Sequence, residues 1–94
     1  MKEQQIQSKI VKYLEKQGAY VVKVVAATKK GVPDLLVCYK GVFVGVEVKV
    51  PEKKKNTTKL QDLNLQKIQA ASGFSCVAWS NEQIEDVLDL IDKI

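Results

Sequence analysis

The segment 34–50 constrains the fold more than any other part of the chain. It contains two stretches rich in β-branched and other apolar residues, 34–39 and 42–50, and only Lys40 and Gly41 lie between them. Two such stretches around a short connection that contains glycine predict a β-hairpin with a tight turn. Every second residue of the latter stretch is valine over residues 42–48, and this alternation predicts that one face of the second strand packs into a core.

The short turn also fixes which residues face each other across the hairpin. If Tyr39 pairs with Val42, counting back along both strands places Asp34 opposite Glu47, with Cβ atoms about 4.5–5.5 Å apart. Because side chains alternate along a strand, Lys49 points to the same face as Glu47. We therefore expect two carboxylates and one ammonium group to converge at the open end of the hairpin.

This convergence predicts a metal site. Two carboxylates that face each other repel, and burial raises the cost of keeping both charged. Lys49 supplies a single positive charge, so a divalent cation is the expected complement. Mg²⁺ prefers oxygen ligands and commonly takes one or two carboxylates, which makes Asp34 and Glu47 candidate ligands. The alternative interpretation is that both are ordinary exposed charges at strand ends, with Asp34 in a turn after Pro33.

The rest of the chain predicts elements that would cover this hairpin. Apolar residues at helical spacing indicate helices, and β-branched runs indicate strands. The predicted elements are helices over 3–17, about 58–72 and from residue 80 or 81 onward, strands over 20–26, 34–39, 42–50 and 74–79, a basic loop over 27–33 and a mobile loop over 51–59. We expect one domain spanning 1–94, with an α/β fold and a mixed sheet, because a helix connects the last two strands and makes them parallel.

Composition excludes several kinds of active site. The chain has no histidine, so Ser-His-Asp and Cys-His catalysis and every His-ligated metal are excluded, and its two cysteines are too few for a zinc site within one chain. All 15 basic residues are lysine. Residues 1–80 hold 14 lysines against six acidic residues, whereas residues 81–94 hold one lysine against five. A basic body favours an anionic partner, first of all nucleic acid, and the absence of arginine argues against reading base sequence.

Six lysines flank the candidate site in sequence and are candidates for phosphate contacts. They are Lys29, Lys30, Lys53, Lys54, Lys55 and Lys59. A solvated basic loop is the alternative for each of them. The low cysteine count favours a reduced, intracellular location. No apolar segment approaches the ~20 residues of a membrane span, so no membrane partner is expected.

Two further residues are candidates for the same site. Glu3 lies three residues before Ile6, which places it on the stripe of the first helix that we expect to be buried, where it could point at the site. The alternative is a first-turn glutamate that interacts with the helix dipole. Gln61 could contact a phosphate or a water, but it also completes a capping box with Thr58. We expect these two roles to be compatible only if the side chain does not turn back to the cap.

Four motifs taken in order resemble the PD-(D/E)XK nuclease superfamily. They are Glu3 on the first helix, Gly31-Val32-Pro33-Asp34, Glu47-Val48-Lys49 on a strand, and Gln61 on the next helix. The segments Gly-Val-Pro-Asp-Leu-Leu-Val and Val-Glu-Val-Lys, with Leu-Gln and a helix that ends Ala-Ala-Ser-Gly, are similar to the VRR-NUC branch. The resemblance covers nearly the whole chain. The one departure is Ser72-Gly73, where relatives often have a glycine pair.

The resemblance implies a restriction-endonuclease-like αβββαβ core with a mixed sheet, here with an extra C-terminal helix. It implies phosphodiester hydrolysis that depends on Mg²⁺ or Mn²⁺. Carried over by motif, Asp34, Glu47 and the carbonyl of Val48 would bind the metal, and Lys49 would orient the water or stabilise charge. By the same carry-over, Glu3 would help to hold the metal or its water, and Gln61 would assist nearby.

The resemblance also implies a substrate and an assembly. Small members of this branch are similar to archaeal Holliday junction resolvases, which act on branched DNA as homodimers. Two alternatives remain open at this point. One is a non-catalytic nucleic-acid-binding module, and the other is a nuclease subunit that another protein directs to its substrate.

Overall fold

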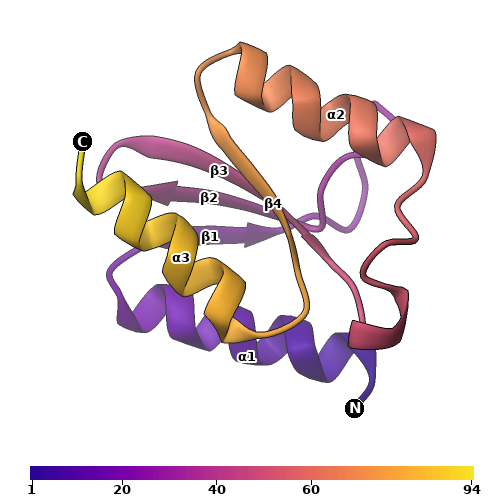
Figure 1. The fold of residues 1–94 in the computed structure, drawn as a ribbon, viewed down its shortest axis with the longest axis horizontal. Helices are drawn as coiled ribbons and strands as arrows, with labels where there is room; N and C mark the ends of the chain where they lie inside the picture. Colours follow the sequence, from indigo (N-terminus) through magenta and orange to yellow (C-terminus); the bar gives the residue numbers. More distant parts are fainter.

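The computed structural model describes residues 1–94, which form a four-stranded sheet with helices on both faces (Figure 1). The helices and strands in chain order are α1 (Glu3–Lys16), β1 (Tyr20–Lys23), β2 (Leu35–Tyr39), β3 (Val42–Val48), the 3₁₀ turn η1 (Pro51–Lys53), α2 (Lys59–Ala70), β4 (Phe74–Ala78) and α3 (Asn81–Asp92). The strand order is β1-β2-β3-β4, antiparallel except for the parallel pair β3–β4. The predicted α/β fold with a mixed sheet is therefore confirmed.

The hairpin has the predicted turn and register. Lys40 and Gly41 both have positive φ angles, 50° and 78°, as two-residue hairpin turns of type I′ require. Tyr39 pairs with Val42, and the pairing continues to Leu35 opposite Val46. One residue further along each strand, this register brings Asp34 and Glu47 to the same level of the hairpin.

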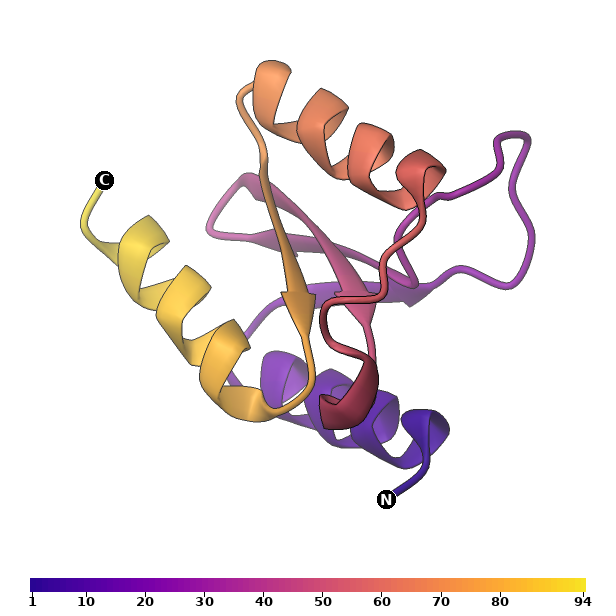
Figure 2. The same ribbon diagram turned by 45° about the vertical axis from the view of Figure 1, so that its right-hand side comes forward.

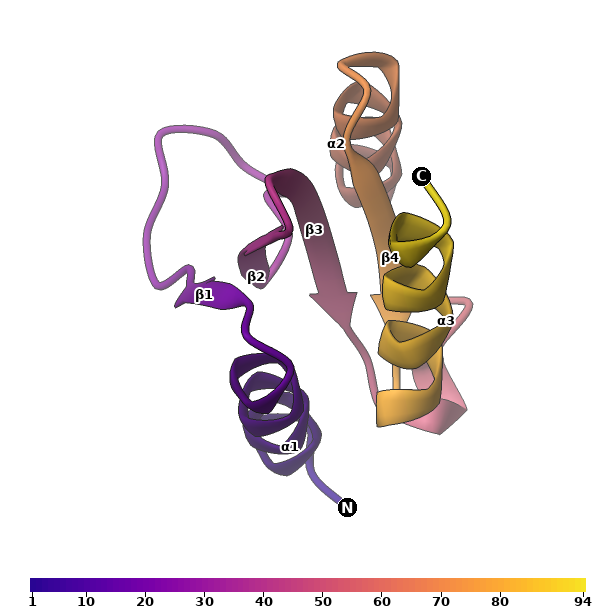
Figure 3. The same ribbon diagram turned by 90° about the vertical axis from the view of Figure 1, so that its left-hand side faces the viewer.

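One face of the sheet carries the main hydrophobic core. Val44, Val46 and Val48 of β3 are at most 2% exposed and belong to a cluster of 13 buried residues. The helical members of this cluster come from α1 and α3, which lie on the same side of the sheet (Figure 3). They are Ile6, Ile10, Leu14, Ile84, Leu88 and Ile91. The alternating valines thus bury one face of β3 as predicted.

The other face of the sheet lies beneath α2. Gly45 of β3 is buried there, and a Cβ added to it would lie 2.5 Å from Cδ1 of Ile68 and 3.1 Å from Cγ of Pro33. Glycine therefore allows α2 to approach the sheet closely. The helix begins with the predicted capping box, in which the backbone N–H of Gln61 donates to Oγ1 of Thr58 over 3.1 Å.

Several element ends differ from the prediction, including those of β1 and β3. β1 ends at Lys23. The N–H of Val24 still donates to the carbonyl of Asp34 over 2.9 Å, but the next partner residue, Pro33, interrupts the pairing strand. β3 ends at Val48, and Pro51 begins the η1 turn inside the segment that we expected to be a mobile loop. None of the helices combines the length and the apolar character that crossing a membrane would need.

Candidate active site

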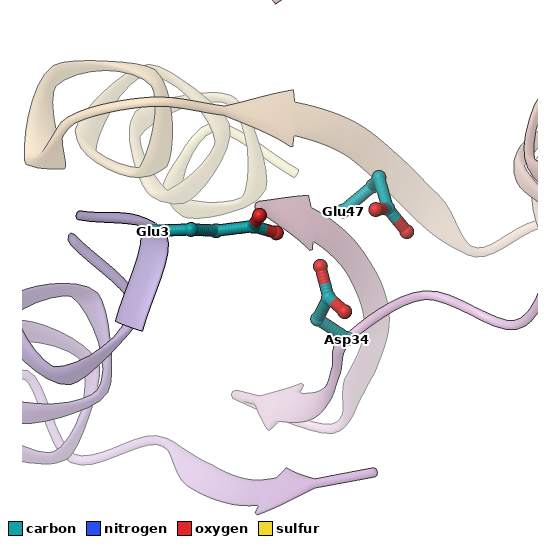
Figure 4. A group of neighbouring side chains, drawn as sticks. All are labelled: Glu3, Asp34 and Glu47. Atoms are coloured by element: carbon teal, nitrogen blue, oxygen red, sulfur yellow. The ribbon is translucent and has the colours of Figure 1, made fainter. Parts of the chain in front are cut away.

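Three carboxylates from three separate segments meet at one end of the sheet (Figure 4). Glu3 is the first residue of α1, Asp34 directly precedes β2, and Glu47 is the penultimate residue of β3. One oxygen from each side chain lies within 4.8 Å of the others. The structure thus brings together the two residues that the hairpin register paired and the glutamate from the first helix.

Backbone hydrogen bonds position Asp34. Its carbonyl accepts from the N–H of Val24, and its Oδ2 accepts from the N–H of Val48 over 2.8 Å. The carboxylate is therefore bonded to the backbone of β3 one residue beyond Glu47. This bond occupies one lone pair of Oδ2, so the other lone pair of Oδ2 and both lone pairs of Oδ1 stay available to another ligand.

Glu47 is a carboxylate in an unfavourable position for its charge. It is only 3% exposed. The pKa of Glu47 is raised to about 8, chiefly by burial and next by the neighbouring Asp34, while Lys49 opposes the increase. A group with so high a pKa holds its negative charge at neutral pH only with further positive charge beside it. The site therefore has the electrostatic character of a cation site.

Lys49 and Gln61 both approach the same oxygen of Glu47. The ammonium Nζ of Lys49 lies 3.7 Å from Oε2, and Nε2 of Gln61 donates to Oε2 over 3.2 Å. The side chain of Lys49 is 16% exposed, so its charge is partly withdrawn from water. Together the two groups fix the orientation of the Glu47 carboxylate.

The predicted conflict between the two roles of Gln61 is wrong. Oε1 of its amide accepts from the backbone N–H of Thr58 over 2.9 Å and so completes the cap of α2. The other end of the same amide, Nε2, donates to Glu47. Because an amide carries an acceptor and two donors at separate atoms, one side chain both caps α2 and contacts Glu47. Contact of Gln61 with a phosphate or a water stays a prediction.

The prediction for Glu3 is correct in place but wrong in burial. Glu3 is exposed and lies outside the buried stripe of α1, which consists of Ile6, Gln7, Ile10 and Leu14. It reaches the other carboxylates from the first turn of the helix. Sequence reasoning missed Gln7, a polar side chain only 8% exposed.

The residues present fit a hard divalent cation. Three carboxylates supply oxygen ligands, and Mg²⁺ and Mn²⁺ favour such ligands. The high pKa of Glu47 indicates that the metal-free arrangement lacks positive charge. Glu3, Asp34 and Glu47 are the side chains that would hold the ion. The carbonyl of Val48 lies in the adjacent backbone, and its part as a ligand stays a prediction.

The six lysines that we predicted to contact nucleic acid are all exposed. Lys29 and Lys30 lie in the loop between β1 and β2, which extends beside the first turns of α2 (Figure 2). The carbonyl of Lys30 accepts from Nδ2 of Asn64 in α2 over 3.1 Å, which ties this loop to the helix. Lys54 lies elsewhere, with its Nζ 4.8 Å from the centre of the Trp79 ring. The basic side chains therefore lie in two separate places, one beside α2 and one beside Trp79.

Comparisons with known proteins agree with this arrangement. The profile of the family described as archaeal Holliday junction resolvase (Hjc) matches residues 2–90. A solved structure described as a "VRR_NUC domain" is 28% identical, with a TM-score of 0.72, over 93% of this chain and 94% of that chain. No curated protein matches. The range that the family profile matches, residues 2–90, contains the whole sheet and all the residues of the candidate site.

Proposed function

The chain belongs to the archaeal Holliday junction resolvase family, and from this premise we propose that it is an endonuclease that hydrolyses phosphodiester bonds of branched DNA. We propose further that it requires Mg²⁺ or Mn²⁺ and acts as a homodimer. The observation that carries the proposal is the meeting of Glu3, Asp34 and Glu47 within 4.8 Å, with Lys49 beside them.

In the proposed reaction, the oxygen of a water molecule forms a bond to phosphorus, and the bond from phosphorus to one sugar oxygen breaks. The water loses a proton, and the leaving sugar oxygen gains one. A divalent cation, when bound, makes a water more acidic and neutralises negative charge on the phosphate. Asp34 and Glu47 hold their oxygens in place through Val48 N–H and Gln61 respectively. Lys49 is placed to neutralise charge that develops beside Glu47.

The lysines supply affinity for the DNA backbone in this proposal. Residues 1–80 have eight more lysines than acidic residues, and lysine contacts to phosphate depend little on base sequence. Selection of branched DNA would then come from its shape. A homodimer would bring two sites to one junction, since a chain of this size spans few base pairs.

Cleavage of a panel of labelled DNA structures tests the proposal. The panel contains a four-way junction, a flap, a nicked duplex and an intact duplex, each with Mg²⁺, Mn²⁺ or EDTA. We expect metal-dependent cleavage of branched substrates. Lys49→Ala and Glu47→Gln should each lower the rate by about 100-fold or more while binding is retained. Lys93→Ala and Glu85→Gln, which change exposed residues of the C-terminal segment, are the matched controls.

Binding without cleavage on every substrate would contradict the proposed activity and favour a non-catalytic binding module. Cleavage only after addition of a second protein would favour a directed subunit. Sedimentation at micromolar concentration tests the assembly separately. A purely monomeric chain that still cuts junctions would contradict the homodimer alone.

A further inference from the structure

A cavity lies beside the first turns of α1, the helix that also supplies Glu3, and plays no part in the proposed reaction. Its volume is about 410 Å³, within the range typical of small-molecule pockets. The first turns of α1, the η1 turn and the start of α3 enclose it, and these segments lie together in Figure 2. Ile6, Pro51 and Trp79 supply apolar surface, and Lys9 and Asn81 supply polar groups.

The cavity is adjacent to Lys49. Trp79 directly follows β4, and the backbone N–H of Lys49 donates to the carbonyl of Ala78 over 3.0 Å. Trp79 therefore lies one residue from the point where Lys49 joins the neighbouring strand, and paired strands are only about 4.8 Å apart. Glu3 of the acidic site comes from the same turn of α1 that supplies Ile6.

The polar groups around the cavity favour a nucleic-acid component. Lys9 lines it, and Lys54 lies over the ring of Trp79, whereas Glu52 is the one acidic residue of the lining. Trp79 lines the cavity and is partly exposed, whereas Lys54 is not a lining residue. Oδ1 of Asn81 is buried and has no hydrogen-bond partner. This oxygen is closed off from the cavity, so Lys9 and the indole of Trp79 are the groups that a base in the cavity would contact.

From these observations we infer that the cavity receives an unpaired nucleobase, stacked against Trp79, from the DNA strand held at the acidic site. Aromatic side chains beside basic residues bind bases of single strands without regard to sequence, because every base has a flat π surface. The inference rests on the proposed nuclease function and narrows its substrate. Branched DNA with an unpaired nucleotide next to the cleaved bond should bind more tightly than a fully paired junction.

The fluorescence of Trp79 provides a direct test, since it is the only tryptophan of the chain. The protein is titrated in EDTA, so that no strand is cut, with a short single-stranded oligonucleotide and with an abasic one of equal length and charge. We expect the oligonucleotide with bases to quench the fluorescence strongly and the abasic one to leave it nearly unchanged. Equal quenching by both would overturn the inference, because only charge would then be sensed.

A variant series separates stacking from folding. Trp79→Leu should lower the affinity for a branched DNA with an unpaired nucleotide by about tenfold, within the ~1–3 kcal/mol typical of one stacked base. The same variant should bind the abasic counterpart as the unaltered protein does. Tyr20→Leu removes an aromatic residue that is 72% exposed on β1 and is the matched control. Trp79→Phe keeps an aromatic ring and should restore most of the affinity, whereas equal loss on both DNAs would contradict stacking.

The outcome of the fluorescence and affinity measurements is independent of the outcome of the cleavage assay. Base-dependent quenching without any cleavage would retain the nucleobase site and reject the nuclease activity. Cleavage with normal rates but no base-dependent quenching would retain the nuclease and reject the nucleobase site.

Discussion

The two faces of the sheet differ in what their side chains do. Beneath α1 and α3, residues of β2, β3 and β4 join a cluster of 13 buried hydrophobic residues. Beneath α2, the helix contributes a single buried residue, Leu65, and this residue lies outside that cluster. The same side holds the buried charge of Glu47 and its bond to Gln61. The face beneath α1 and α3 therefore supplies most of the free energy of folding, so the face beneath α2 can hold a destabilising carboxylate.

The largest expected effect on stability comes from a substitution in the core beneath α1 and α3. Ile10 is fully buried at the centre of α1. Ile10→Ala should lower the free energy of unfolding by about 2–5 kcal/mol, because it removes apolar contacts and leaves a cavity. Urea denaturation measures this loss. Ile10→Val, with an expected cost of about 0.5–1.5 kcal/mol, keeps the comparison measurable if the alanine variant does not fold. Leu63→Ala on α2, at a residue 43% exposed, should change stability far less.

A smaller effect is expected where α2 packs on the sheet. Gly45→Ala would place a methyl group against Ile68 and Pro33, and overpacking of this kind costs about 1–3 kcal/mol. The shift of α2 should also move Gln61 and lower the cleavage rate. Combining Gly45→Ala with Ile68→Val should recover part of both losses, since it shortens the nearest side chain. Denaturation and cleavage measured together check this. If the double variant is no better than Gly45→Ala in either measurement, the clash lies with Pro33 instead.

The pH dependence of stability should show that the buried Glu47 beneath α2 destabilises the fold when it loses its proton. Its pKa is raised by burial from 4.5 to about 8, so the metal-free folded state holds a proton that the unfolded chain releases. The stability from this proton is complete below the unfolded pKa and is lost as pH rises to about 8.

In EDTA, the melting temperature of the unaltered protein should therefore fall more between about pH 5 and about pH 9 than that of Glu47→Gln, by at least ~4 °C. Saturating Mg²⁺ should reduce this fall. Parallel pH curves for the two proteins would contradict the assignment.

The two cysteines allow the accessibility of the two faces to be compared without any substitution. Cys38 of β2 is exposed, whereas Cys76 of β4 packs against the core cluster, and burial raises its pKa to about 12. Because the thiolate is the reactive form, a thiol reagent should label Cys38 and leave Cys76 unmodified in the folded protein. Mass spectrometry of the labelled peptides checks this. Equal labelling of both would indicate that the core face opens readily.

The sequence predicted the hairpin side of the site well, because local rules determine it. A two-residue turn and the alternation of side chains are enough to bring Asp34 and Glu47 together. The lengths of the strands were less predictable. A strand extends only as far as its partner can pair, and in β1 that limit depends on Pro33, a residue distant in sequence. Propensity alone does not contain this information.

The tertiary parts of the site were predicted less completely. Glu3 reaches the carboxylates because of where α1 docks, and helical spacing gave it the wrong burial. Gln61 touches Glu47 because α2 packs closely over Gly45. The cavity beside Trp79 is formed by three segments that no motif connects. In each case the missing information was the relative position of elements far apart in the chain.

The turn at Lys40 and Gly41 has a consequence for how the gene can vary. Side chains repeat with a period of two along β3, so inserting or deleting one residue in this turn would reverse the orientation of the whole strand relative to β2. Glu47 would then point into the hydrophobic core, and the valines would point to the opposite face of the sheet. Residue types that accept a positive φ angle, such as asparagine and glycine, should be tolerated at these two positions, but changes of length should not. Relatives of this chain should therefore keep the number of residues in this turn.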